Sequence, residues 1–224
     1  MRKLLITIDG PAGAGKTTVS RLLAERLGYR YVDTGALYRG VAYAADRRGI
    51  SAADDAGLSG LLEGLSLSFL PGTGGQRLTA DGVDITEAIR TPEISMLASA
   101  VSARPVVRAF LLKVQRDLGR RKAAVFEGRD MGTVVFPDAD AKFFLNASPR
   151  VRAQRRFAEI ADASGASIEA VQRDMELRDR QDSTRALAPL RAAADAVTID
   201  ATALSVEQVV ERMLAHVQTV LSGR

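Results

Sequence analysis

The residues whose types and spacing are best suited to chemistry lie near the start of the chain. Gly10, Gly15, Lys16 and Thr17 fit the spacing G-x-x-x-x-G-K-[ST] of a phosphate-binding loop. Glycines let the backbone turn so that several N–H groups face one anion. The lysine can reach the β- and γ-phosphates of a nucleotide, and the threonine hydroxyl can bind Mg²⁺. We therefore expect a nucleotide site formed by Gly10, Pro11, Ala12, Gly13, Ala14, Gly15, Lys16, Thr17 and Thr18.

Two more groups of polar residues come after predicted strands. Asp33, Thr34 and Arg39 come after a short apolar segment, 29–32, and a second group, 127–132, comes after the apolar segment 123–126. In parallel α/β sheets, ligands bind beyond the carboxyl ends of the strands. We therefore expect Asp33, Thr34 and Arg39 to share a crevice with the phosphate loop, and Thr34 to cap the helix that begins beside it.

Arginines are concentrated in two later segments. Four of them, Arg150, Arg152, Arg155 and Arg156, lie within a turn and a half of a helix predicted to start at Ser148-Pro149. Further along, arginines alternate with acidic residues over 178–185. A run of charge is usually a solvated helix face. For the first segment, which follows a predicted strand in a phosphate-binding domain, a clamp on ATP is a rival interpretation, and these residues alone leave both open.

The elements that position these residues have a strand–helix rhythm. Apolar segments at 4–8, 29–32, 123–126, 141–145 and 196–199 predict strands of one parallel sheet. Helical spacing predicts helices that start at Thr17, Thr34, Asp54, Thr91-Pro92, Pro105, Ser148-Pro149, Ile168 and Val206. The helix from Ile168 is predicted to end at Asp179. From Ser66 to Ile85 the pattern alternates around a Gly-rich turn at 72–75, which predicts two or three antiparallel strands inserted into that rhythm.

The composition limits the possible functions. The 224 residues are 46% hydrophobic, which suits one sizeable domain with a real core, and they include one histidine and no cysteine. Disulfides, thiolate metal sites and histidine clusters are therefore excluded, and no apolar run approaches the length of about 20 residues of a membrane span. We expect a cytoplasmic protein without a signal peptide. The formal net charge is +4, and 26 of the 31 basic residues are arginines.

Four stretches together resemble one known family. These are IDGPAGAGKTT, DTGALYRGVA, EGRDMGTVVFPDA and RDRQDSTRALAPL, with DAVTIDAT near the end of the chain. The chain resembles bacterial cytidylate kinases, which are nucleoside monophosphate kinases with a phosphate-binding loop. The resemblance runs over nearly the whole chain, including the small β insertion. It implies a monomer that takes its phosphoryl group from Mg²⁺·ATP and gives it to CMP or dCMP, with neither nucleic acid nor membrane as a partner.

The same resemblance implies a role for each matching residue. Lys16 and the loop amides would hold ATP, with Arg39 and Arg129 on the acceptor phosphate, helped by Arg185. Cytosine would be read by Ser99, Arg108 and Asp130, and the ribose by Arg178 and Asp182. Thr34 would also contact the substrate. Thr17 would bind Mg²⁺ directly, and Asp33 and Glu127 through water. The catalytic group would be Lys16, Arg39, Arg129, Arg152, Arg155 and Arg156.

The family also implies how the chain is divided. The expected fold is α/β, a parallel-sheet core with helices on both faces, a small antiparallel insertion in the region that binds the acceptor, and a short helical lid. Within a single kinase domain, the core would comprise 1–53, 97–149 and 185–224, the insertion about 54–96, and the lid about 150–184.

Three other functions compete with this prediction. A kinase of the same fold acting on UMP, AMP or shikimate is opposed by the β insertion and by Asp130. A GTPase-like switch would need an Asn-Lys-x-Asp motif, but the only asparagine is Asn146 and it has other neighbours. An RNA-binding module is disfavoured because four tyrosines, seven phenylalanines and no tryptophan offer few stacking surfaces.

Overall fold

The computed structural model of the protein describes residues 2–72, 75–164 and 167–223. The chain forms two compact units: the first contains Met1–Val32 and Arg121–Arg224, and the second contains Asp33–Arg120. The chain therefore leaves the first unit once and returns to it once.

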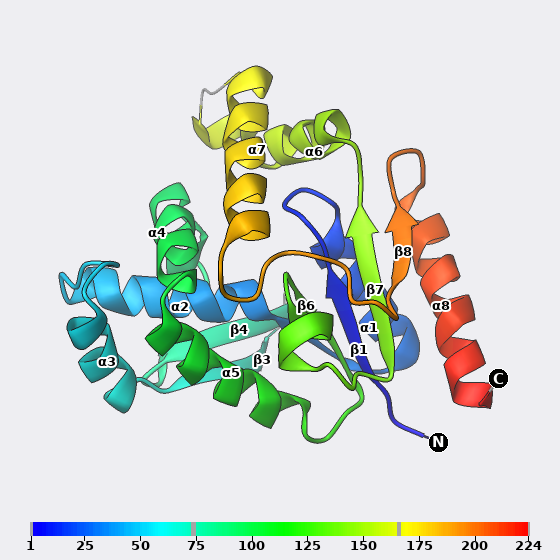
Figure 1. Cartoon of the computed structure of the whole chain (residues 1–224), viewed down its shortest axis with the longest axis horizontal. Coiled ribbons are helices and arrows are strands. Elements are labelled where there is room, and N and C mark those ends of the chain that lie inside the picture. The colour runs from blue at the N-terminus through cyan, green and yellow to red at the C-terminus, as the bar shows by residue number, and fades with distance from the viewer. Residues whose placement is uncertain (1, 73–74, 165–166, 224) are drawn as a thin grey trace. The chain divides into compact units, whose positions relative to one another are not determined.

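The first unit is built on a five-stranded sheet with the strand order β2-β6-β1-β7-β8 (Figure 1). Its strands are β1 (Leu5–Asp9), β2 (Arg30–Asp33), β6 (Ala124–Gly128), β7 (Ala141–Asn146) and β8 (Val197–Asp200). The central strand β1 runs parallel to both β6 and β7, and β7 runs parallel to β8. The register pairs Asp9 with Gly128, so the segments after β1 and β6 start at the same edge of the sheet. The predicted parallel sheet is confirmed.

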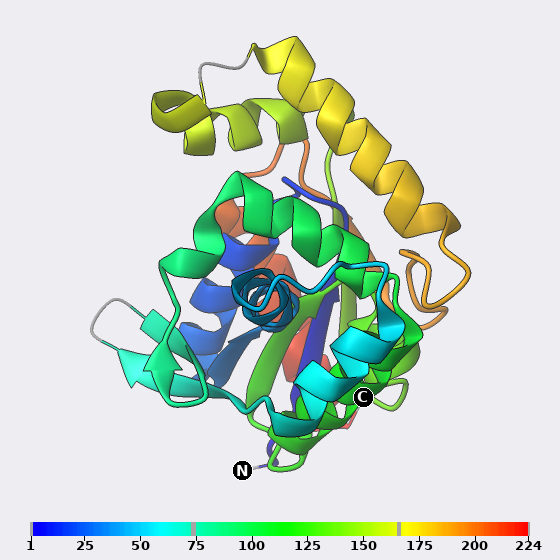
Figure 2. The same ribbon diagram turned by 90° about the vertical axis from the view of Figure 1, so that its left-hand side faces the viewer.

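Helices complete the first unit. They are α1 (Lys16–Leu27), α6 (Pro149–Ser164), α7 (Ile168–Thr184) and α8 (Val206–Ser222), with one π-helical turn, η2 (Met131–Val135). Alternate residues of β1, among them Ile6 and Ile8, share a buried cluster with residues of α1 and α8, so these helices cover one face of the sheet. On the other face η2 lies close to Thr7, since a Cβ on Gly132 would stand 3.0 Å from the Thr7 hydroxyl. Helices α6 and α7 lie side by side (Figure 2).

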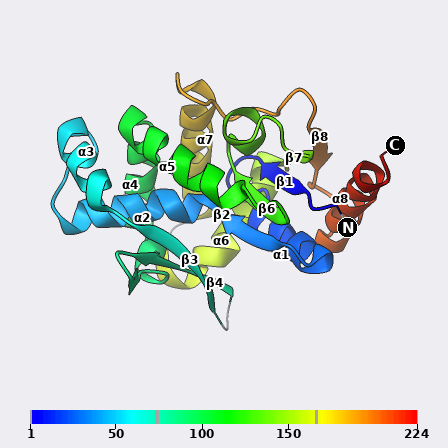
Figure 3. The same cartoon turned by 90° about the horizontal axis from the view of Figure 1, so that it is seen from below.

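The second unit combines helices with a small antiparallel sheet. In chain order it contains α2 (Thr34–Arg47), α3 (Asp55–Gly64), β3 (Leu67–Gly72), β4 (Gly75–Ala80), β5 (Val83–Asp84), η1 (Ala88–Arg90), α4 (Pro92–Ser102) and α5 (Pro105–Gly119). The strands β3, β4 and β5 pair antiparallel, as the alternating pattern predicted. Figure 3 shows β3 and β4 beside α2. The middle of the predicted Gly-rich turn, 73–74, lies outside the described residues.

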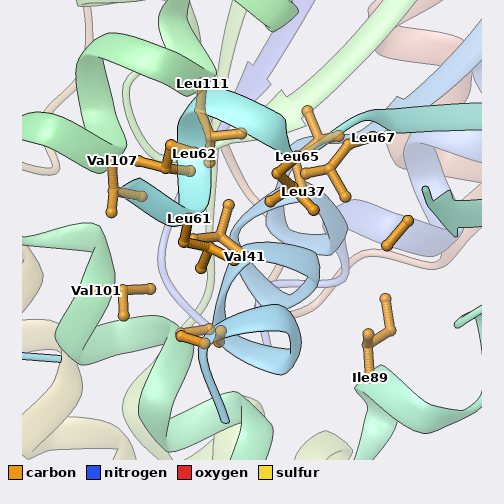
Figure 4. Packing of buried hydrophobic residues seen from close by; sticks show 14 of the residues in the cluster. Leu37, Val41, Leu61, Leu62, Leu65, Leu67, Ile89, Val101, Val107 and Leu111 are labelled. Atoms are coloured by element: carbon orange, nitrogen blue, oxygen red, sulfur yellow. The ribbon is translucent and has the colours of Figure 1, made fainter. Parts of the chain in front are cut away.

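One hydrophobic core holds the second unit together. Leu37 and Val41 of α2 pack with Leu61 of α3, Leu67 of β3 and Leu111 of α5 (Figure 4). Because this core joins α2 and α5 to the small sheet, the residues from Asp33 to Arg120 form one compact unit. The predicted division into core, insertion and lid is a functional one, and it stays a prediction.

Local details differ from three expectations. Thr34 is not the cap of α2: it is the first helical residue and is buried, and the carboxylate of Asp33 accepts the Ala36 amide instead. Both residue types can cap, but the chain turns into the helix one residue earlier than predicted. Helix α7 continues to Thr184 rather than ending near Asp179, and the π-helical turn η2 was not expected.

Within the described ranges, no single helix is long and apolar enough to cross a membrane. By length and composition alone, α4 and α5 taken together would be long and apolar enough for a membrane span, but the two helices are bent by 98° relative to each other.

Candidate functional site

The phosphate loop has the geometry that its glycines require. Gly13 and Gly15 adopt φ values of +70° and +95°, and Gly10 has φ of +152°. A Cβ on Gly10 would lie 2.0 Å from the Leu145 carbonyl oxygen, so only glycine fits where the loop leaves β1. Gly15 directly precedes α1, and Thr17 and Thr18 are exposed in the first turn of that helix. The loop therefore leads into a helix N-terminus, where backbone N–H groups and the helix dipole favour an anion.

Lys16 is the buried cation of this loop. Its ammonium donates to the Pro11 carbonyl oxygen at 2.7 Å, and only 8% of the residue is exposed. The pKa of Lys16 is lowered to about 7, and burial is the largest cause. The positive charges of Arg129 and Arg178 lower this pKa further, whereas the negative charges of Glu127 and Asp9 raise it. Two arginines from outside the loop therefore lie close enough to repel Lys16. A polyphosphate placed among them would relieve this repulsion.

Thr17 and Glu127 form a hydrogen-bonded pair beside the loop. The Thr17 hydroxyl donates to Glu127 Oε1 at 2.9 Å, and the Tyr31 hydroxyl donates to the same oxygen at 2.5 Å. Because the Thr17 proton is directed at Glu127, the lone pairs of its oxygen face elsewhere. In the described part of the chain, no three His, Cys, Asp or Glu residues form a metal-binding group. This oxygen set fits Mg²⁺, which protein side chains hold at one or two positions while water and phosphates fill the rest.

Next to this pair, a network of two arginines and two aspartates joins the segment after β6 to the end of α7. Arg129 Nε donates to Asp182 Oδ2 at 3.1 Å. Arg185 lies 3.8 Å from Asp182 Oδ1 and 3.6 Å from Asp130 Oδ1. Both aspartates are buried, and the two arginines are largely so. The structure therefore brings together four of the residues predicted to bind the acceptor.

The predicted lid arginines contact the outer side of the phosphate loop. Arg152 is buried and donates to the Ala12 carbonyl oxygen at 3.2 Å, and it forms an ion pair with Asp179. Arg155 donates to the Ala14 carbonyl oxygen at 3.1 Å. Arg156 is different, because its partner is Glu159, one turn further along the same helix at the surface. The charge run is thus divided: two arginines lie on the loop and one is solvated.

In the second unit, the predicted site residues form two local groups. Arg39 is half-buried and pairs with Asp33 at 2.9 Å across the first turn of α2. Arg108 of α5 donates to the Ser102 carbonyl oxygen at 3.3 Å, and the Ser102 hydroxyl donates to the Ser99 carbonyl oxygen. Ser99 and Arg108 are therefore linked through the end of α4. That residues of this unit share a crevice with the phosphate loop stays a prediction.

Comparison with known proteins decides the family. A sequence profile of cytidylate kinases matches residues 6–219. A cytidylate kinase of Geobacter sulfurreducens is 53% identical over 95% of this chain and 91% of its own length. Another, from Geobacter sp. strain M21, is 49% identical over 94% of this chain and 91% of its own. The chain belongs to the cytidylate kinase family.

The family predicted from the four sequence stretches is therefore confirmed, and with it the prediction of an ATP-dependent kinase. A solved structure with a similar fold is an uncharacterised protein from Eubacterium ventriosum. Its TM-score is 0.54 at 11% identity, over 97% of this chain and 99% of that one. At that identity the likeness concerns the fold alone.

Three residues of this cytidylate kinase site were missed in the sequence. Asp9 accepts the amides of Met131 and Gly132, Tyr31 binds Glu127, and Asp179 binds Arg152. Asp9 carried a signal, since a carboxylate between a buried strand and a glycine loop is rarely core material. Nothing in the local sequence around Tyr31 or Asp179 indicated their roles, because their partners are distant in the sequence.

Proposed function

We propose that this kinase transfers the γ-phosphoryl group of ATP to CMP or dCMP, producing ADP and CDP or dCDP. One observation carries the proposal in this structure. The buried Lys16 of the phosphate loop lies within electrostatic reach of Arg129, and Arg129 belongs to the network of Asp130, Asp182 and Arg185. A cradle for donor phosphates and a set of groups suited to an acceptor nucleotide therefore stand side by side in one unit.

The donor is assigned to the phosphate loop. The loop amides and the N-terminus of α1 would hold the phosphates of ATP, and Lys16 would turn from the Pro11 carbonyl to the β- and γ-oxygens. The acceptor oxygen belongs to a phosphate that is already ionised, so the reaction needs no strong base. Cations that stabilise charge on the transferring group do most of the work, which suits a chain rich in arginine.

The acceptor is assigned to the residues that the family resemblance implies. Arg39 and Arg129 would bind its phosphate as planar forks, with Arg185 beside them. Arg178 and Asp182 would contact the ribose, and Thr34 would be a further contact. Asp182 has a second task here, because it holds Arg129 through Nε, while Arg129 Nη1 donates to the Gly128 carbonyl oxygen at 3.3 Å.

Mg²⁺ would be held by the Thr17 hydroxyl, and through water by Glu127 and Asp33. When bound, the ion neutralises charge on the donor phosphates. Glu127 fixes the Thr17 hydroxyl in the orientation that such a ligand needs.

The remaining assignments come from the family. The lid would be 150–184, with Arg152, Arg155 and Arg156 beside the donor phosphates, and the acceptor-binding insertion about 54–96. Their closure would exclude water and suppress ATP hydrolysis. We also propose that the enzyme acts as a cytoplasmic monomer, without nucleic acid or membrane as a partner.

The choice of base is assigned mainly to Asp130. Cytosine offers an N4 amine, which donates, where uracil offers the O4 oxygen. An ionised aspartate only accepts, so Asp130 would bind the amine and repel O4. Arg108 would donate to N3 or O2, and Ser99 can do either. An unpaired buried contact of this kind costs about 1–3 kcal/mol, which predicts a preference for CMP over UMP of at least about tenfold to a hundredfold.

The test is a coupled assay that offers CMP, dCMP, UMP and AMP with Mg²⁺·ATP to the wild type, Lys16→Ala and Asp130→Asn. CMP and dCMP should be the best acceptors, and Lys16→Ala should lose nearly all turnover while staying folded. Asp130→Asn should narrow the ratio of kcat/KM for CMP to that for UMP, because an amide can present its NH₂ to O4. A wild type that prefers UMP or AMP would refute the proposal.

A further inference from the structure

Asp9 is a buried carboxylate for which the reaction as proposed has no use. It is the last residue of β1, directly before the phosphate loop, and only 3% of it is exposed. Its two oxygens accept hydrogen bonds from the amides of Met131 and Gly132, each at 2.8 Å. Those amides open the turn η2, so a side chain from the central strand caps a turn that lies far along the chain.

The capping by Asp9 affects Asp130, which stands at the N-cap position of the same turn. An aspartate there ordinarily binds the amide of the second or third residue of its own turn. Asp130 makes no such bond. Its carboxylate lies 3.6 Å from Arg185 instead. Asp9 has taken over the capping, and this leaves the Asp130 carboxylate directed at the acceptor network.

The space around the turn is matched to this contact. A Cβ on Gly132 would stand 3.4 Å from Asp9 Oδ2 and 3.3 Å from the Lys142 side chain. The turn therefore approaches β1 closely. Burial raises the pKa of Asp9 to about 6, and the two amides hold it down, so the carboxylate is ionised at neutral pH and both oxygens accept.

We propose that Asp9 is a positioning residue for acceptor choice: by capping the turn η2 in place of Asp130, it keeps the Asp130 carboxylate directed at Arg185 and the acceptor network rather than at its own turn. This inference rests on the proposed function, since it concerns the recognition of cytosine by Asp130. Two aspartates thus divide two tasks: Asp9 caps the turn η2, and Asp130 recognises the base.

Replacing the Asp9 carboxylate with an amide should weaken the choice of acceptor base. In Asp9→Asn, the side-chain oxygen can serve one amide, while its NH₂ faces the other N–H. The Gly132 or Met131 amide is then released, and Asp130 turns back to cap its own turn. We expect the ratio of kcat/KM for CMP to that for UMP to fall by about tenfold, because a contact specific to cytosine is lost. The affinity for CMP without ATP, measured by calorimetry, should fall more than that for UMP.

Asp140→Asn is the matched control. Asp140 is also a buried carboxylate that accepts an amide of β1, that of Leu5 at 2.8 Å, but it lies at the opposite end of the strand. This variant should lose stability and keep the CMP to UMP ratio.

The double variant Asp9→Asn/Asp130→Asn distinguishes positioning from simple damage. If Asp9 acts through Asp130, the ratio in the double variant equals that in Asp130→Asn alone, because no carboxylate is left to divert. If the two substitutions instead lower the ratio by independent factors that multiply, the inference is overturned, and an unchanged ratio in Asp9→Asn overturns it as well. A wild type that does not prefer CMP would instead refute the proposed function, so the two failures are distinguishable.

Discussion

The Asp9 carboxyl group should give the stability of the protein a distinct dependence on pH. Burial raises the pKa of Asp9 to about 6, above the usual value of 3.8. Between these two values the folded protein keeps a proton that the unfolded chain has released. The free energy of unfolding contributed by Asp9 therefore falls as the pH rises from about 4 to about 6, by up to about 3 kcal/mol.

Urea unfolding of the wild type and Asp9→Asn at pH 4, 5, 6 and 7 measures this effect. Asparagine does not titrate, and carboxylates that do not interact with Asp9 cancel in the difference between the two proteins. The negative charge of Asp130, which raises the pKa of Asp9, and the positive charge of Lys16, which lowers it, are part of the measured effect. The stability of the wild type relative to the variant should decrease as the pH rises through that window. A difference that is constant or increases with pH contradicts the assigned burial of Asp9.

At the scale of single residues, the sequence identified the groups that belong to compact motifs. The spacing of Gly10, Gly15, Lys16 and Thr17 predicts the phosphate loop because loop, helix and ligand chemistry are all local. The contacts of Arg152 and Arg155 were not predictable in this way. Their partners are the carbonyl oxygens of Ala12 and Ala14, and backbone groups carry no side-chain signal in a sequence.

At the scale of elements, apolar periodicity located every strand of the five-stranded sheet to within one or two residues. It failed where ends depend on tertiary contacts. Helix α7 continues to Thr184, where Asp182 and nearby Arg185 join the network with Arg129 and Asp130. The turn η2 could not be predicted from the local sequence, because its first two amides donate to Asp9, which belongs to the distant strand β1.

Helix α3 offers a test of how element stability is encoded, because two of its glycines have opposite surroundings. Gly60 is exposed, and a Cβ there would meet nothing within 4 Å. A Cβ on Gly57 would lie 2.4 Å from Asp54 Oδ2, the cap of the helix, whose other oxygen accepts the Gly57 amide. Gly60→Ala should stabilise the protein by about 0.5–1 kcal/mol, since alanine loses less backbone entropy on folding.

Gly57→Ala should instead destabilise it by about 0.5–2 kcal/mol, because the new methyl group displaces the capping carboxylate. Both values are read from urea unfolding curves, and each variant is the control for the other. Equal effects in the two variants would show that the cap does not hold the start of α3.

At the scale of the whole molecule, the chain has a separate core in each of its two units, with Leu37 and Leu111 in one and Ile6 and Met213 in the other. The family resemblance predicted a single kinase domain with an insertion and a lid, and that functional division stays a prediction. The large share of arginine among the basic residues has a partial structural account. Arg129, Arg152, Arg155 and Arg185 all bind carbonyl oxygens or carboxylates around the site.

Ligand binding should raise the stability of the whole molecule in a way that separates the donor from the acceptor. A ligand at 100 times its Kd stabilises the folded state by about 2.7 kcal/mol. For a chain of this size, each kcal/mol raises the thermal midpoint by about 2–4 °C, so Mg²⁺·ATP or CMP alone should raise it by about 5–11 °C. The measurement is thermal unfolding of the wild type, Lys16→Ala and Asp130→Asn with each ligand.

Lys16→Ala should lose most of the shift caused by ATP and keep the shift caused by CMP, because Lys16 is assigned to the donor phosphates only. Asp130→Asn should keep the shift caused by ATP, and its shifts with CMP and UMP should become more nearly equal. If either variant loses both shifts together, the substitution has damaged the fold rather than one site. If each variant keeps both shifts, neither residue binds the ligand assigned to it, and the separation of donor and acceptor groups proposed for this kinase is wrong.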